Sequence, residues 1–292
     1  MTIYVPGKVT LRQTWQPMDP DAAAYITAVE TADGQALEEK VKIAIDNFVL
    51  GCKADGIWSA IKASCILAGA RTLAGALVPL VGTAPTNVNF VSGDYDRETG
   101  LVGDGSTKYL DSNRNNNADP QNSKHISCFA STLPTSGSGQ YPRIITSGDS
   151  AGNDSFIHRL NNNGNLLVNV NDSGTNTVSP SIGFLGVSRS ISTSYFFRGG
   201  GSTQTLANSS NVPRNADIGI FASTDAQQPA NARLAFYSIG EALDLAALDT
   251  RVTRLMNLIT YTQTAGLPDL STMDMDAAAY IGGAYRAGGT LS

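Results

Sequence analysis

The feature that most constrains the fold is a succession of short apolar runs, rich in β-branched and aromatic residues, between residues 85 and 240. Segments rich in Asn, Asp and Gly, such as Asn161–Asn165 and Asn171–Gly174, separate the runs, and these residue types tolerate the positive φ of tight turns. Many short strands separated by turns predict an all-β sandwich or barrel. Because no helical pattern lies between the strands to serve as a crossover, we expect largely antiparallel sheets. The predicted strands are residues 88–91, 125–130, 143–146, 155–160, 166–170, 182–187, 194–198, 217–222 and 233–239.

Amphipathic helices are expected on both sides of this β region. Asp19 is a predicted N-cap followed by Pro in the first turn, and apolar residues at helical spacing then predict a helix over about 21–32. The same spacing predicts a second helix from residue 37 to about residue 52 and, after an Asp-Gly break, a third short helix over 57–66. A closing helix is predicted at about 244–262.

These patterns divide the chain into four parts. We expect an extended N-terminal arm (1–17), a small helical unit (18–84), a β-sandwich with its closing helix (85–262) and a C-terminal tail with a short helix (263–292). The arm has β-branched residues but no core of its own, so it either frays, adds a strand to the sheet edge of a neighbour, or lies across a partner.

The tail repeats the start of the first helix. Residues 273–281 match residues 18–26 at eight of nine positions, with an offset of 255, and the shared Met, Asp, Tyr and Ile argue against chance similarity between two Ala-rich helix starts. We therefore expect a modular unit of about 255 residues, with the chain ending soon after the start of another copy. A starting helix without its own partners can dock on a neighbouring subunit. The candidate assembly contacts are Tyr4 and Trp15 in the arm and Tyr280 and Ile281 in the tail.

Composition and charge argue against several classes of protein. Charged residues make up only 15% of the chain, and 20 Lys and Arg are outnumbered by 25 Asp and Glu without any basic cluster, which argues against nucleic-acid binding. Three Cys without a CxxC spacing argue against a disulfide framework and a zinc site. No apolar run is long enough for a membrane span, and no secretory signal is readable, so we expect a soluble protein made in a reducing cytoplasm.

The acidic cluster Asp94–Glu98 is the one place where the β region suggests glycosidase chemistry. Alternate positions of a strand would put Asp94, Asp96 and Glu98 on one face, and glycoside hydrolysis needs two facing carboxylates. However, Thr99-Gly100 follows directly, and a solvated turn is the simpler interpretation. Asp94, Asp96 and Asp104 are the candidate ligands for a Ca²⁺ ion, but we expect no catalytic residue, cofactor or metal.

The two histidines, His125 and His158, both lie within predicted strands, and the chain has no Gly-x-Ser-x-Gly elbow. We interpret them as hydrogen-bonded strand residues. The segment 103–108 lacks the spacing of a phosphate loop and is interpreted as a tight β-turn, and Gly199–Ser202 as a hairpin tip. The β region has no Trp, and most of its Tyr residues lie in apolar strands, so a glycan-binding face is open but unsupported by the pattern.

Four segments, 21–26, 51–58, 101–110 and 233–240, resemble a group of tailed-bacteriophage virion and prophage proteins that carry a concanavalin A-like (laminin-G-like) jelly-roll. The resemblance covers residue 18 to about residue 262. It implies a structural or adsorption role in the particle, as a fibre, baseplate or decoration component, and it implies no catalytic residue.

We therefore expect a mainly β protein, in which a small helical unit precedes an antiparallel jelly-roll sandwich and an amphipathic helix follows it. The expected function is that of a non-enzymatic virion structural protein, assembled in the host cytoplasm, in a tail fibre or baseplate appendage for host adsorption. Capsid decoration, as a cement or head-fibre protein, and a jelly-roll polysaccharide depolymerase are the alternatives. Expected partners are other virion proteins, further copies in a homotrimer and a host-surface glycan, with no nucleic acid and no membrane.

Overall fold

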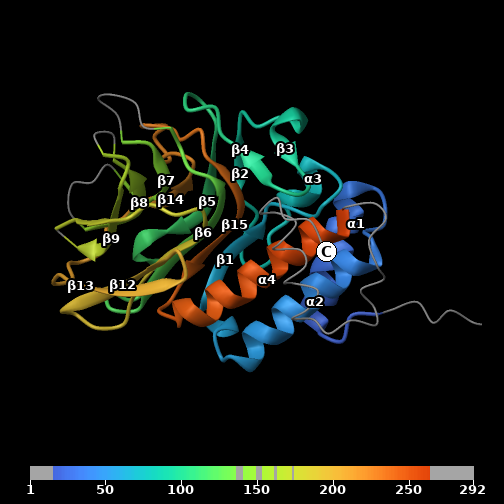
Figure 1. The fold of residues 1–292 in the computed structure, drawn as a ribbon, viewed down its shortest axis with the longest axis horizontal. Helices are drawn as coiled ribbons and strands as arrows, with labels where there is room; N and C mark the ends of the chain where they lie inside the picture. Colours follow the sequence, from blue (N-terminus) through green and yellow to red (C-terminus); the bar gives the residue numbers. More distant parts are fainter. Residues whose placement is uncertain (1–15, 136–140, 149–152, 161–162, 173, 264–292) are drawn as a thin grey trace, which may run out of the picture.

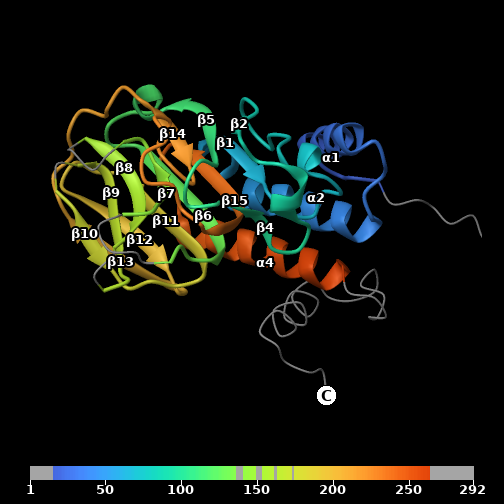
Figure 2. The same ribbon diagram turned by 90° about the horizontal axis from the view of Figure 1, so that it is seen from above.

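In a computed structural model of the chain, the structure describes residues 16–135, 141–148, 153–160, 163–172 and 174–263. These residues form three layers (Figures 1 and 2): a group of helices, an eight-stranded sheet and a seven-stranded sheet. One apolar core lies between the two sheets, and a second lies between the helices and the outer face of the eight-stranded sheet. The predicted antiparallel two-sheet sandwich is confirmed.

Every pair of strands in both sheets is antiparallel within the described residues. The helices are α1 (Pro20–Asp33), α2 (Glu39–Ala54), α3 (Leu73–Ala76) and α4 (Leu245–Gln263), and 3₁₀ turns occur at Trp58–Ala60, Ser92–Asp94 and Asn116–Ala118. In spatial order the eight-stranded sheet contains β13 (Ser202–Ala207), β12 (Ser194–Gly199), β11 (Gly183–Arg189), β6 (Lys124–Thr132), β15 (Arg233–Gly240), β4 (Gly100–Val102) and β3 (Tyr95–Asp96), and β1 (Ile61–Ile66) also pairs with β15. The seven-stranded sheet contains β10 (Asn176–Val178), β9 (Leu166–Asp172), β8 (Asp154–Arg159), β7 (Arg143–Thr146), β14 (Asp217–Ile220), β5 (Tyr109–Asn115) and β2 (Thr86–Val88).

The hairpin of β12 and β13 shows how the pattern of residues places side chains on the two faces of a sheet. Tyr195 and Phe197 are buried in the core between the sheets, whereas Phe196 between them points to the opposite face and is 36% exposed. The tip is a two-residue loop, Gly200-Gly201, whose φ angles of 58° and 74° are both positive, as a type I′ turn requires. The predicted hairpin tip is confirmed.

The helices at both ends of the described chain begin as predicted. The Asp19 carboxylate caps α1 by accepting hydrogen bonds from the backbone N–H groups of Asp21 (2.9 Å) and Ala22 (3.3 Å). The apolar stripe of α4 is buried against α2 and against the outer face of the sheet, and it includes Leu248, Val252 and Ile259. In both views α4 lies alongside α2 in the helical layer (Figures 1 and 2). No helix in the described part of the chain combines the length and apolarity needed to cross a membrane.

The predicted third helix over 57–66 is wrong. Residues 58–60 form a 3₁₀ turn, and Ile61–Ile66 is strand β1, which pairs antiparallel with β15 from Ile61–Gly240 to Ile66–Phe236. Side chains of this strand are buried in both cores: Ala63 and Cys65 lie in the core between the sheets, and Ile61 and Ile66 lie in the core under the helices. A strand that precedes residue 85 therefore belongs to the sandwich.

Candidate functional site

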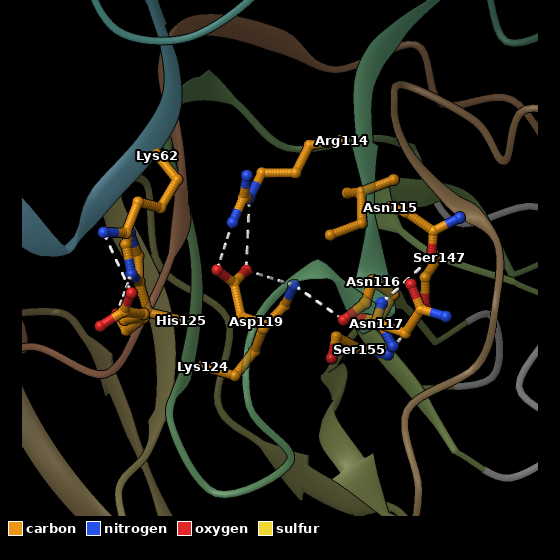
Figure 3. A network of polar contacts seen from close by, with 12 residues as sticks. Lys62, Arg114, Asn115, Asn116, Asn117, Asp119, Lys124, His125, Ser147 and Ser155 are labelled. Atoms are coloured by element: carbon orange, nitrogen blue, oxygen red, sulfur yellow. Dashed lines mark hydrogen bonds and ion pairs between the residues drawn. The ribbon is translucent and has the colours of Figure 1, made fainter.

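A network of buried polar side chains lies at one end of the sandwich (Figure 3). Lys124, the first residue of β6, is fully buried, and its Nζ donates to Asp119 Oδ2 (3.0 Å) and to the Asn116 carbonyl (3.1 Å). Arg114 contacts both oxygens of the same carboxylate: its Nε donates to Oδ2 (3.3 Å) and its Nη2 donates to Oδ1. Burial lowers the pKa of Lys124 to about 8, against the attraction of Asp119, because a charged ammonium is costly to remove from water.

Amide and hydroxyl groups continue the network into the seven-stranded sheet. Asn116 Nδ2 and Ser155 Oγ each donate to Asn171 Oδ1 at 3.1 Å, and Ser147 Oγ donates to Asp154 Oδ1 at 3.2 Å. These groups join the 3₁₀ turn after β5 to the end of β9 and the start of β8. Because these contacts connect segments that are distant in sequence, we infer that they hold the loops at this end of the sandwich in place.

A second buried cation, Arg189 of β11, donates hydrogen bonds to backbone carbonyls of neighbouring segments. Its Nε donates to the Val170 carbonyl at 2.8 Å, and its Nη1 donates to backbone carbonyls that include those of Ser194 (3.2 Å) and Asn208 (3.1 Å). Asp172 is its counter charge at 3.7 Å. In both clusters the buried cation is matched by a carboxylate and by backbone carbonyl groups, so we interpret these contacts as structural.

The histidines fit this structural interpretation in part. His125 is buried between the Glu241 carbonyl (2.6 Å from Nδ1) and Ser238 Oγ (2.8 Å from Nε2), so the prediction of a hydrogen-bonded strand histidine is confirmed. Burial lowers its pKa to about 4, which keeps the ring neutral at pH 7. His158 is also buried and stacks on Phe156 at 4.2 Å, but its Nε2 has no hydrogen-bond partner within the described residues, which the prediction did not foresee.

The acidic candidates from the sequence are not brought together around an open site. Asp104 Oδ1 accepts from the backbone N–H groups of Ser106, Thr107 and Lys108 at 2.8–3.0 Å. Burial alone would raise the pKa of Asp104, but these N–H donors hold it well below its usual range. Residues 103–108 therefore form the tight turn that the sequence predicted. The ammonium of Lys108 also reaches Asp94 Oδ1 at 2.6 Å.

The Asp94 and Asp96 carboxylates of the Asp94–Glu98 cluster accept hydrogen bonds from nearby backbone N–H groups. Asp94 Oδ2 accepts from Val91 N (2.8 Å), and Asp96 Oδ1 accepts from Glu98 N (3.0 Å) and Thr99 N (2.8 Å). Strand β3 spans only Tyr95–Asp96, so Asp94, Asp96 and Glu98 do not share the face of one strand. The interpretation of this cluster as a turn is therefore confirmed. The described residues contain no group of three or more His, Cys, Asp or Glu side chains suited to a metal ion. Tyr4, Trp15, Tyr280 and Ile281 lie outside the described residues.

An open groove of about 440 Å³ lies on the helix-facing side of the eight-stranded sheet, where β11, β12 and β13 meet the start of α4. Phe196 is the one aromatic side chain among the described residues that line it. The groove is also lined by the hydroxyl-bearing residues Ser188, Ser190 and Thr203 and by the apolar side chain of Leu245. The sequence contained a signal that was not used: in the run 194–198, alternation puts Phe196 on the face opposite to Tyr195 and Phe197.

The floor of this groove is fixed to rigid elements. Ser188 Oγ donates to the Leu243 carbonyl (3.0 Å) and accepts from its N–H (3.2 Å), which joins β11 to the segment before α4. Asp244 caps α4, since its Oδ1 accepts from Ala246 N at 2.7 Å. Close by, Arg198 of β12 pairs with Asp249 of α4 at 2.7 Å. Among the described residues that line the groove, Asp244 is the charged one, and its Oδ1 is already bonded to the first turn of α4. The aromatic face and the hydroxyl groups suit an uncharged ligand that carries both C–H faces and hydroxyls.

No family model and no curated protein matches the chain. Solved structures similar to the chain include the binding domain of botulinum neurotoxin serotype D, with 12% identity, a TM-score of 0.45, and coverage of 65% of this chain and 51% of that one. The binding domain of botulinum neurotoxin DC in complex with rat synaptotagmin II has 14% identity, a TM-score of 0.43, and coverage of 70% and 52%. Trypanosoma rangeli sialidase has 11% identity, a TM-score of 0.43, and coverage of 67% and 33%. The chain thus spans about half of the neurotoxin chains, and a likeness at this level does not define what it binds.

Proposed function

We propose that the chain is a non-catalytic structural protein of a bacteriophage virion, in a tail-fibre or baseplate appendage, and that the groove around Phe196 binds a neutral sugar of the host surface. The half-exposed Phe196 ring beside hydroxyl groups is the observation that carries the binding part of this proposal. The virion part rests on the resemblance of segments 21–26, 51–58, 101–110 and 233–240 to phage proteins.

The physical argument for a sugar is complementarity. A pyranose presents an apolar C–H face that stacks on an aromatic ring, and its hydroxyls exchange hydrogen bonds with water for hydrogen bonds with Ser and Thr. Phe196 is held on a sheet between two buried neighbours, Tyr195 and Phe197, so little conformational entropy is lost when a ligand stacks on it. A single stacking platform gives weak binding per copy, and several copies in one particle would raise the avidity.

A non-catalytic role agrees with the way the acidic and histidine side chains are used. Asp94, Asp96 and Asp104 are hydrogen-bonded to nearby groups of their own chain, and His125 is buried with both ring nitrogens bonded. These groups stabilise turns and strands, so none of them is poised as a general acid or base.

The groove is tested by measuring binding of purified Phe196→Ala and wild-type protein to an array of bacterial surface glycans and to host cells. We expect the variant to lose at least tenfold in affinity for the glycan that the wild type binds, because the stacking face is removed. Val212→Ala is the matched control, since this apolar side chain is 71% exposed and does not line the groove. Equal affinity for wild type and Phe196→Ala would refute the assignment of the groove.

The placement in the virion is tested separately. Locating the protein on particles by electron microscopy and counting its copies by quantitative mass spectrometry distinguishes an appendage from a capsid decoration protein, which would be present in many copies on the head. Polysaccharide cleavage that is lost in Glu98→Gln would favour a depolymerase instead. Sedimentation of the purified protein measures whether it is the homotrimer that we expect.

A further inference from the structure

The start of α1 is held by three side chains, Asp46 and Lys53 of α2 and Trp58 of the following 3₁₀ turn, which we call the α1 seat. Asp46 is 1% exposed, and its carboxylate accepts from the backbone N–H groups of Met18 (3.3 Å) and Asp19 (3.0 Å). The seat therefore binds the main chain just before the helix begins.

The other two residues of the seat bind side chains of the first helical turn. Lys53 Nζ contacts Asp19 (2.7 and 2.8 Å) and Asp21 (2.7 Å), and Trp58 Nε1 donates to Asp21 at 3.2 Å. Asp19 is at the same time the N-cap of α1, so one carboxylate both starts the helix and anchors it. The spacing of the two aspartates is what allows a single ammonium to bind both.

Three apolar side chains complete the contact. Ala22, Tyr25 and Ile26 of α1 are 0%, 5% and 3% exposed and belong to the core under the helices. The α1 seat and this core together select a sequence of the form Asp-x-Asp-Ala-x-x-Tyr-Ile.

Residues 273–281 contain this sequence a second time. Asp274, Asp276, Ala277, Tyr280 and Ile281 stand where Asp19, Asp21, Ala22, Tyr25 and Ile26 stand in α1. The one difference in nine positions is Met275 in place of Pro20, and Pro20 is exposed. Every side chain of α1 that meets the seat or is buried in these two turns thus recurs in the tail.

Contacts further along α1 do not recur. Asp33 accepts from the backbone N–H groups of Arg71 (2.7 Å) and Thr72 (2.9 Å), but its counterpart in the tail is Gly288. Val29 is 1% exposed, and its counterpart is the smaller Ala284. A tail segment in the seat would therefore bind less tightly than α1, which also has the advantage of covalent attachment.

We propose that residues 273–281 of one copy of the chain bind the α1 seat of another copy, in place of that copy's own α1. The choice of a second copy rests on the proposed function in a virion. Because residues 273–281 compete with a covalently attached α1, they occupy the seat in few copies in dilute solution. They occupy it in a larger fraction of copies at the high local concentration inside an assembled particle. The exchange would link copies head to tail and release the displaced α1.

The test is zero-length cross-linking of the full chain with a carbodiimide, which joins an ammonium directly to a carboxylate. Copies labelled with ¹⁵N are mixed with unlabelled copies, and the cross-linked peptides are identified by mass spectrometry. We expect Lys53 linked to Asp19 or Asp21 in most molecules, and Lys53 linked to Asp274 or Asp276 of a differently labelled copy in a minority. The second product should increase severalfold in Tyr25→Ala, which weakens the attached helix.

Two tail variants separate a specific contact from random collision. Tyr280→Ala should abolish the links of Lys53 to Asp274 and Asp276, whereas Met275→Ala should leave them unchanged. The proposal is overturned if Lys53 links only to Asp19 or Asp21, in Tyr25→Ala as in the wild type, or if all links to the tail join residues of the same copy. Because glycan binding is measured at Phe196, these results and the test of the adsorption function can fail independently.

Discussion

The clearest quantitative test of the structure is the replacement of Asp119 by Asn. Asp119 is 3% exposed and, within the described part of the chain, is the carboxylate that contacts the fully buried Lys124, at 3.0 Å. Breaking a buried ion pair by removing one partner costs about 3–5 kcal/mol, because the remaining charge has lost its counter charge. Against a total stability on the order of 5–15 kcal/mol for a domain, Asp119→Asn should remove a large part of the free energy of unfolding.

The pH dependence of this cost follows from Lys124. Its pKa is about 8 in the folded protein and near 10.5 in the unfolded chain, so the folded state releases the proton first. Stability of the wild type should therefore gain from this group as the pH rises from about 8 to 10.5. In Asp119→Asn the attraction that raises this pKa is lost, so the gain should begin at a lower pH.

The assay is urea unfolding followed by circular dichroism at pH 7. Glu241→Gln is the matched control, since it removes the Lys62–Glu241 pair (3.0 Å), whose side chains are 33% and 43% exposed and should contribute only about 0–1 kcal/mol. The double variant with Lys124→Met should recover most of the loss, because an apolar side chain needs no counter charge. A loss for Asp119→Asn no larger than that of Glu241→Gln would refute the reasoning.

Two further predictions concern single residues. The pKa of His125 is about 4 in the folded protein and 6.5 in the unfolded chain, so this residue contributes roughly 3 kcal/mol of stability above pH 6.5 that is lost as the pH falls towards 4. In a series of urea-unfolding measurements over this range, the free energy of unfolding should depend less on pH in His125→Gln than in the wild type. An unchanged pH dependence would contradict the assignment. Gly100→Ala should lower the free energy of unfolding by more than about 2 kcal/mol, because the φ of Gly100 is +96° and a Cβ there would lie 2.1 Å from the Leu234 carbonyl oxygen. Gly34→Ala, at φ +68° with nothing within 4 Å, should lose only about 1–2 kcal/mol, and equal losses at the two glycines would rule out the clash.

The sequence predicted the elements whose pattern is local. Alternation and turn residues identified strands such as β6 and β15, and the cap at Asp19 and the apolar stripe of α4 identified two helices. The segment 57–66 was misjudged because the spacing of Ile57, Trp58 and Ile61 imitates a helical turn. Its true partner, β15, lies about 170 residues further along the chain, and local periodicity holds no information on such a pairing.

The polar network and the groove were harder to predict than the strands. Lys124 and Asp119 look like ordinary surface residues in the sequence, and their burial depends on how loops from distant strands meet. The alternation around Phe196 does predict its face, but the groove exists only because α4 begins beside β11 and β12. The alternation in residues 194–198 therefore contains the orientation of the aromatic ring, although it was not used as a prediction, and the groove around the ring has no local signal in the sequence.

The pairing of β1 with β15 also has a consequence for synthesis on the ribosome. β1 ends at residue 66 and β15 begins at residue 233, so the first strand is made long before the strand that completes its hydrogen bonds. At about 5–20 residues per second, the delay is on the order of ten to thirty seconds. During that time Ile61 and Ile66 lack the β15 partner that helps to bury them, and the early segment should be a target for chaperones. Once β15 is in place, it joins material from both halves of the chain, so the nascent protein should become protease-resistant late and in one step.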